Sequence, residues 1–298
     1  MNSYDKEIYF HIPGAFERSK ICIVLIDLMN IEPHLFKDNA KIGSAYGAPG
    51  GIWNGGRLVK NGYRCKEDLA NLKDAYERYG VPVRFTYTNP LIVDNLVYDA
   101  YCNMVLDTFN TGNNEIICNS PALEDYLRDK YGDSYKYISS TTKRLTDKTE
   151  QTQELEKDYY LVVLDYDHNH DYKYLESIEQ KDQCEILVNP VCMTNCPKRV
   201  EHYKSIAESQ LNHMDYSMTC PFGQIKPYYL VKQQPNYISP ELINSRYIPL
   251  GFSQFKIEGR TADPLELVEI LIDYLVKEEY KLEVRMKLHT IAIARTYE

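Results

Sequence analysis

The segment from Asn189 to Arg199 holds the densest group of reactive side chains in the sequence. It contains Cys192 and Cys196, and Cys220 follows further along the chain. Thiolates are ligands of zinc and of iron–sulfur clusters, and a helix N-terminus stabilises the deprotonated thiol. We expect Cys192, Cys196 and Cys220 to bind a metal or a 4Fe-4S iron–sulfur cluster. The alternative is that all three are buried, reduced thiols.

The remaining ligand of such a cluster is not fixed by the cysteine spacing. Cys65 and Cys118 are the two candidates for the fourth position, and a non-protein ligand is equally allowed. A zinc ribbon is excluded, because the sequence has no paired Cys-x-x-Cys motifs.

A second group of charged side chains lies in the segment from Gly251 to Arg260. Strand alternation places Phe255 and Ile257 on one face and the charged residues on the other, namely Lys256, Glu258 and Arg260. In a helix-covered barrel the apolar face packs outward, so the charged face points inside and its charges must be paired. One interpretation is a structural ion network. The other is a catalytic group in which Arg260 and Lys256 bind an anion and Glu258 orients them.

Polar residues also recur where the predicted strands end. These residues are His11, Asn54, Asn89, Asn119, Asp165, Asn189 and Glu258. Barrel enzymes build their active sites at this rim, so we expect the four asparagines to bind substrate, with Arg57 and Arg199 as further contacts to an anion. Asparagine is also a common turn residue, which is the simpler explanation for any single one.

The elements that must position these residues alternate along the chain. Eight segments read as strands: Glu7–His11, Gly51–Asn54, Val83–Asn89, Glu115–Ser120, Tyr137–Thr141, Tyr160–Asp165, Cys184–Asn189 and Phe252–Arg260. Amphipathic helical segments separate them, two of which begin with Ser120-Pro121 and Asp263-Pro264 as cap and first turn. Eight strands joined by helices predict a closed (β/α)8 TIM-type barrel.

We expect one domain over residues 1–298, with the barrel at about 7–279 and residues 281–298 as a peripheral extension. An open doubly wound sheet is the rival fold. It usually has a glycine-rich phosphate loop after its first strand, where this chain has Ile12-Pro13-Gly14-Ala15.

Composition limits the functional class. The 298 residues are 44% hydrophobic and 26% charged, with a net charge of −9, which indicates a globular protein. No basic block stands out, so no extended nucleic-acid surface is expected, although a local basic pocket is allowed. The longest apolar run, Ile21–Ile26, is too short to span a membrane. We expect a cytoplasmic protein whose partner is a small anionic substrate or another subunit.

The two chemistry-bearing segments together resemble a known family. Phe255-Lys256-Ile257-Glu258-Gly259-Arg260 and the upstream Asn189-Pro190-Val191-Cys192, followed by Cys196 and Arg199, are similar to segments of the collagenase-like (unclassified) peptidases. The resemblance implies a TIM-type barrel. For several members it also implies a four-cysteine 4Fe-4S cluster used in oxygen-independent hydroxylation of a quinone precursor or an RNA base, with prephenate as an oxygen donor. The cysteine spacing here departs from the family's pattern.

Three functions follow as hypotheses. The first is an iron–sulfur barrel enzyme acting on a small or nucleobase-like anionic substrate. The second is a metal-independent, peptidase-like hydrolase or lyase in which Glu258 and His11 serve as acid and base. The third is a non-catalytic module that binds a peptide, RNA or a partner subunit. The sequence contains no Gly-x-Ser-x-Gly, His-Glu-x-x-His or Walker motif.

Overall fold

The computed structural model describes residues 7–59, 62–214 and 227–294, and within them eight parallel strands form a closed barrel in chain order. The strands are β1 (Ile8–Pro13), β2 (Ala40–Gly47), β3 (Val83–Tyr87), β4 (Glu115–Cys118), β5 (Lys136–Ser139), β6 (Leu161–Val163), β7 (Cys184–Leu187) and β8 (Gln254–Lys256). Strand β8 pairs with both β7 and β1, which closes the sheet. The predicted (β/α)8 barrel is confirmed.

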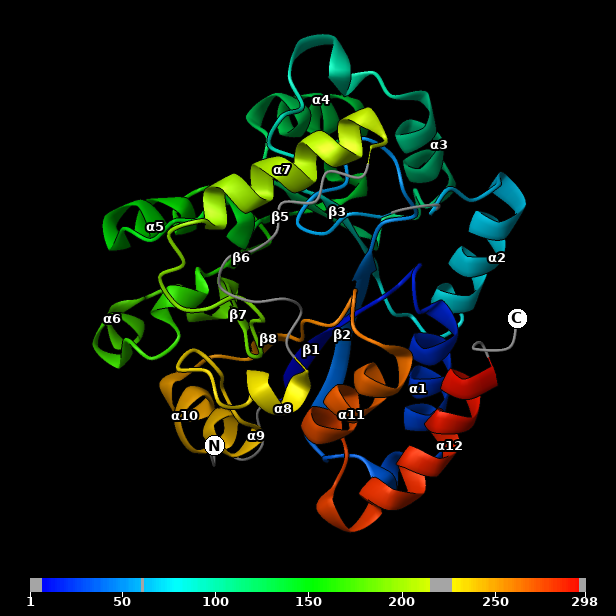
Figure 1. The fold of residues 1–298 in the computed structure, drawn as a ribbon, viewed down its shortest axis with the longest axis vertical. Helices are drawn as coiled ribbons and strands as arrows, with labels where there is room; N and C mark the ends of the chain where they lie inside the picture. The colour runs from blue at the N-terminus through cyan, green and yellow to red at the C-terminus, as the bar shows by residue number, and fades with distance from the viewer. Residues whose placement is uncertain (1–6, 60–61, 215–226, 295–298) are drawn as a thin grey trace.

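Helices surround the barrel (Figure 1). They are α1 (Ser19–Ile31), α2 (Lys66–Glu77), α3 (Ala100–Thr108), α4 (Pro121–Tyr131), α5 (Lys148–Leu155), α6 (Tyr172–Ser177), α7 (Arg199–Asn212), α8 (Tyr228–Val231), α9 (Pro240–Leu242), α10 (Ile248–Leu250), α11 (Pro264–Leu275) and α12 (Lys281–Ala294). Ser120 and Asp263 cap α4 and α11 as predicted. Helix α12 packs against α1 and α11 and begins where the peripheral extension was expected. None of the described helices is long and apolar enough to cross a membrane.

The second strand was predicted wrongly. It was placed at Gly51–Asn54, which instead forms a turn beyond the carboxyl end of β2. The true strand contains Gly43 and Ser44, which give it a weak apolar signal. Their small size has a reason inside the barrel, since a Cβ atom at Gly43 would lie 2.7 Å from the His11 ring. Because the barrel interior is crowded here, the strand contains small residues. These residues do not give the alternating apolar pattern from which a strand is predicted.

The barrel interior is divided into an apolar half and an ionic half. The apolar half, on β4 to β6, consists of Ile117, Ile138, Leu161 and Val163. The ionic half is centred on Glu185 of β7. Arg84 of β3 forms ion pairs with Glu185 and, at 2.5 Å, with Glu115. The side chains of His11 and Lys256 approach Glu185 at 3.3 and 3.2 Å. The prediction that Lys256 points inward is confirmed.

The burial of His11 predicts that the free energy of unfolding depends on pH. Burial and the nearby Arg84 lower its pKa to about 3, so it is neutral in the folded protein. An unfolded histidine titrates near pH ~6.5. As the pH falls below that value the unfolded chain takes up a proton that the folded chain does not, so stability falls from there toward pH 3, by at most about 1.4 kcal/mol per pH unit.

We therefore expect His11→Asn to flatten the loss of unfolding free energy between pH ~6.5 and ~5, above the carboxyl range. Urea unfolding at a series of pH values measures this slope. The exposed His34 gives the matched control, since His34→Asn should keep the wild-type slope. An unchanged slope in His11→Asn would contradict the assignment.

Candidate functional site

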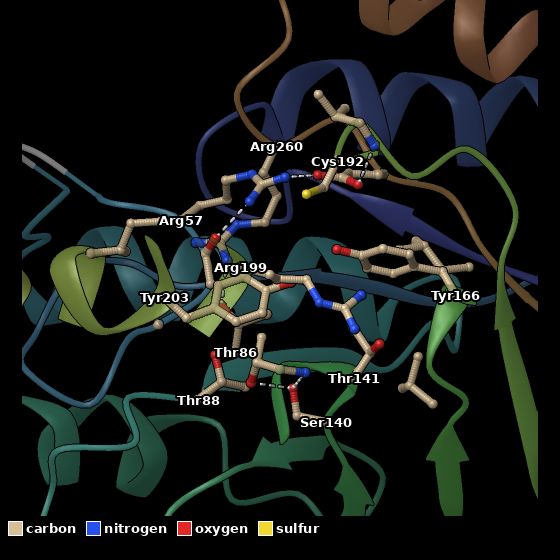
Figure 2. A pocket seen from close by; sticks show the side chains of 18 of the residues that line it. Arg57, Thr86, Thr88, Ser140, Thr141, Tyr166, Cys192, Arg199, Tyr203 and Arg260 are labelled. Atoms are coloured by element: carbon tan, nitrogen blue, oxygen red, sulfur yellow. Dashed lines mark hydrogen bonds and ion pairs between the residues drawn. The ribbon is translucent and has the colours of Figure 1, made fainter. Parts of the chain in front are cut away.

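A cavity of about 360 Å³ lies at the carboxyl ends of the strands. Its floor is apolar and is formed by Ile117, Val163 and Leu187 of the inner barrel wall. Its sides carry polar groups from the loops after β2, β3, β5, β6, β7 and β8 (Figure 2). The cavity therefore occupies the position at which barrel enzymes bind their substrates.

Helix α7 runs across this end of the barrel (Figure 1), and several of its residues line the cavity. Its far end is fixed by Gln210, whose side-chain amide donates to the Gly51 carbonyl at 3.0 Å and accepts from the Val59 N–H at 3.0 Å. Asn89 donates to the carbonyl of Ala207 in the same helix at 3.3 Å. Helix α7 is thus tied to the loops after β2 and β3, and its inner face contributes His202, Tyr203 and Ile206 to the cavity.

Arg199, the first residue of α7, is the most informative group in the cavity. It is 1% exposed, and its Nη2 donates to Asp165 at 2.6 Å and to Asp167 at 3.2 Å. The guanidinium lies 4.3 Å from the centre of the Tyr166 ring. Its Nε and Nη1 have no hydrogen-bond partner among the described residues. The two aspartates hold the side chain in place among the residues that line the cavity (Figure 2).

Arg260 also lines the cavity, but its donors are used within the protein. Its Nη1 donates to Thr86 at 2.8 Å, its Nη2 to Asn54 at 3.1 Å, and its Nε to Glu17 at 2.9 Å. It points inward as predicted, and it joins the segment after β8 to β3 and to the loops after β1 and β2. The contacts of Arg260 therefore hold the loops of the rim together.

Glu258 is held at the edge of the cavity by contacts with three residues. Its carboxylate pairs with Arg57 and accepts from the Val191 N–H at 3.0 Å. Its backbone N–H donates to the Asn189 side-chain oxygen at 2.7 Å, and the Asn189 amide donates back to the Glu258 carbonyl at 2.9 Å. Asn189 therefore joins the chain after β7 to the chain after β8 and does not line the cavity.

The other three rim asparagines have structural partners as well. Asn54 accepts from Thr86 and Arg260, Asn89 donates to the carbonyls of Ile52 and Ala207, and Asn119 donates to Thr142 at 2.7 Å. None of them lines the cavity. His11 lies below it in the ionic half of the barrel. The expected substrate contacts that do line the cavity are Arg57 and Arg199.

The thiols divide into two groups. Cys192 and Cys196 both line the cavity, and burial together with the neighbouring Cys196 raises the pKa of the Cys192 thiol. Cys220 lies outside the described residues. Exposed Cys65 caps α2, and Cys118 packs in the core between β4 and the outer helices. Neither candidate fourth ligand reaches the cavity, and the described chain holds no group of three or more His, Cys, Asp or Glu side chains suited to a metal.

Several cavity residues were missed at the sequence level. Tyr166 and Tyr203 enclose Arg199, and Ser140, Thr141 and Thr142 form the wall after β5 (Figure 2). The Ser-Thr-Thr run at a strand end could have indicated a wall rich in hydroxyl groups. The path of α7, which brings Tyr203 inward, has no comparable signal in the sequence.

Comparison with known proteins adds two likenesses, while the sequence matches no protein-family model. "Uncharacterized protease MJ1657" of Methanocaldococcus jannaschii is 26% identical over 132 residues, which cover 42% of this chain. The matched region spans only 39% of that relative. The structure of the U32 peptidase Mk0906 superposes with a TM-score of 0.51 at 11% identity, covering 85% of this chain and 93% of the other.

The fold thus resembles that of the U32 peptidase Mk0906. The partial sequence match to a protein named as a protease agrees with this likeness, and both support the collagenase-like, or U32, family that the two motifs resemble. Neither likeness points to the iron–sulfur hydroxylation subgroup.

The contacts of Arg260 predict that its loss destabilises the protein more than the loss of an exposed arginine. Arg260→Met would remove the cation beside Glu17 and the N–H groups that donate to Thr86 and Asn54, so we expect a loss of about 3 kcal/mol of unfolding free energy. Arg246→Met removes an exposed pair with Glu176 and should cost at most about 1 kcal/mol. Urea unfolding compares the two variants, and equal losses would show that the Arg260 contacts do not hold the rim.

Proposed function

We propose that this protein is a barrel enzyme of the U32 peptidase type that binds a small anionic substrate under α7. One observation carries the proposal: Arg199 is buried, and two of its guanidinium nitrogens have no partner among the described residues. An unsatisfied buried donor costs about 1–3 kcal/mol, and more when it is charged. An anion in the cavity would remove that cost.

The chemistry around Arg199 supports a carboxylate or a phosphate as the bound group. A guanidinium with unpartnered N–H groups attracts anionic oxygen acceptors, which carboxylates and phosphates supply. Arg57 and Lys256 add positive charge to the lining, and Glu258 is the one carboxylate among the described residues there. The volume, about 360 Å³, and the apolar floor fit a small molecule with one anionic end and an uncharged body.

Arg199→Lys tests the site. Lysine keeps a positive charge near Asp165 but loses the unpartnered guanidinium N–H groups, so we expect succinate and inorganic phosphate to bind at least about tenfold more weakly, a difference of about 1.4 kcal/mol. Isothermal titration calorimetry and the ligand-induced rise in melting temperature measure the change.

Arg246→Lys, on the exposed surface, is the control and should bind both probes as the wild type does. Equal affinity of Arg199→Lys and the wild type for both probes would show that the anion site is elsewhere or absent.

We propose further that the reaction uses an iron–sulfur cluster, which is held beside this anion site. Cys192 and Cys196 would supply two ligands, and Cys220, outside the described residues, a third. Such a cluster supplies one-electron redox chemistry when bound. The residues around it would have separate tasks: Arg199 would hold the anionic end of the substrate, and α7 would keep bulk water out.

This cluster proposal predicts the iron content of two variants. After anaerobic reconstitution with iron and sulfide, Cys192→Ala and Cys196→Ala should each lose the bound iron and its visible absorbance. Cys65→Ser is the matched control and should keep both, because Cys65 is exposed and away from the cavity. Iron retained in either cavity variant, or no iron in the wild type, would rule these ligands out.

The metal-independent alternative draws less support from the geometry. Glu258 lines the cavity, but its expected partner His11 lies below it, bonded to Ser44 at 2.9 Å and Gln254 at 3.0 Å. The two side chains proposed as acid and base therefore do not meet at one site. The non-catalytic alternative remains a hypothesis, which turnover assays on any bound anion address.

A further inference from the structure

Lys256 has a position that neither the anion site nor the thiols explain. It lies in β8, where it is in register with His11 of β1 and Leu187 of β7, so its side chain points into the barrel. It is 8% exposed and lines the cavity above the ionic half. Among the described residues that line the cavity, it is the one lysine.

The surroundings of its amine favour the uncharged form more than an ordinary lysine site does. The Nζ atom lies 3.2 Å from Glu185 and 4.3 Å from the centre of the Tyr46 ring. Glu185 is already paired with Arg84, and Arg260 also lies near the amine. Burial and these two arginines lower the pKa of Lys256 to about 8, although Glu185 raises it. Desolvation and adjacent cations are the two ways in which proteins activate a lysine amine.

A structural counter-charge for Glu185 is the simpler explanation of Lys256. A counter-charge, however, does not need to face a ligand cavity, and Glu185 already has Arg84 on its other oxygen. Lys256 combines access to the cavity with a cationic neighbourhood that disfavours its protonation. These are the properties of a nucleophilic amine.

We propose that Lys256 forms a Schiff base with the carbonyl group of a small 2-oxo carboxylate bound in this cavity. The inference rests on the proposed anion site, which would hold the carboxylate. The neutral amine adds to the carbonyl carbon, the carbinolamine loses one water, and an imine joins Nζ to the former carbonyl carbon. No oxidant or reductant is consumed, and the step is reversible by hydrolysis.

Reductive trapping tests the imine directly. The full-length protein is incubated with pyruvate or 4-methyl-2-oxopentanoate in the presence of sodium cyanoborohydride, which reduces an imine to a stable secondary amine. Intact-mass spectrometry should show one added group, and peptide mapping should place it on Lys256. The corresponding 2-hydroxy acids, which have the same carboxylate and no carbonyl, should bind without any mass increase.

Two variants assign the adduct. Lys256→Arg keeps a positive charge beside Glu185 and cannot form an imine, so it should lose the adduct. Lys198→Arg is the matched control at the start of α7, where Lys198 is exposed and paired with Glu201, and it should retain the adduct. Because the peptide map is made on the wild type, the assignment does not depend on the folding of a variant.

The possible failures are distinguishable. Binding of the 2-hydroxy acids without an adduct from either 2-oxo acid would overturn the Schiff base and leave the anion site intact. Adducts spread over surface lysines and unchanged in Lys256→Arg would overturn it as well. Absence of binding by both kinds of acid would overturn the anion site, and with it this inference.

Discussion

A buried carboxylate, that of Glu185, organises the inside of this barrel. It accepts from Arg84 of β3 and lies beside His11 of β1 and Lys256 of β8, so it connects both sides of the seam at which the sheet closes. Charges removed from water require partners, and a partly paired network is costly. The position of each of these strands is therefore coupled to the others through one charge. The opposite wall needs no such pairing, because it is apolar.

At the rim above, polar side chains are also paired, and most of these pairs are hydrogen bonds. Asn54, Asn189 and Arg260 are each bonded to residues from neighbouring loops, which fixes the positions from which other side chains reach the cavity. The number of internal partners thus separates two kinds of polar residue that look alike in the sequence. Those bonded to neighbouring loops hold the rim, whereas Arg199, which lines the cavity, has two guanidinium nitrogens without a partner among the described residues.

Periodicity was sufficient for the barrel and for the inward face of β8, because both depend on local alternation. Periodicity did not locate β2, because Gly43 is there to leave room for the His11 ring, and that contact joins two different strands. The rim was predictable as a location, since polar residues follow the strands. Which of them face a ligand was not, because Asn54 or Asn89 acquires its partner only in the folded chain. The path of α7 across the barrel depends in the same way on distant contacts, those of Gln210 among them.

The two unusual groups of the cavity share one physical cause. The apolar floor and the covering helix remove water, so a charge there loses its solvation. Arg199 cannot give up its proton and keeps unsatisfied donors, while Lys256 can, and its pKa falls. The proposed 2-oxo acid carries one group for each side chain: its carboxylate would supply acceptors to Arg199, and its carbonyl would react with the neutral form of Lys256. The substrate class proposed here is thus one whose two functional groups match the two unusual side chains of the cavity.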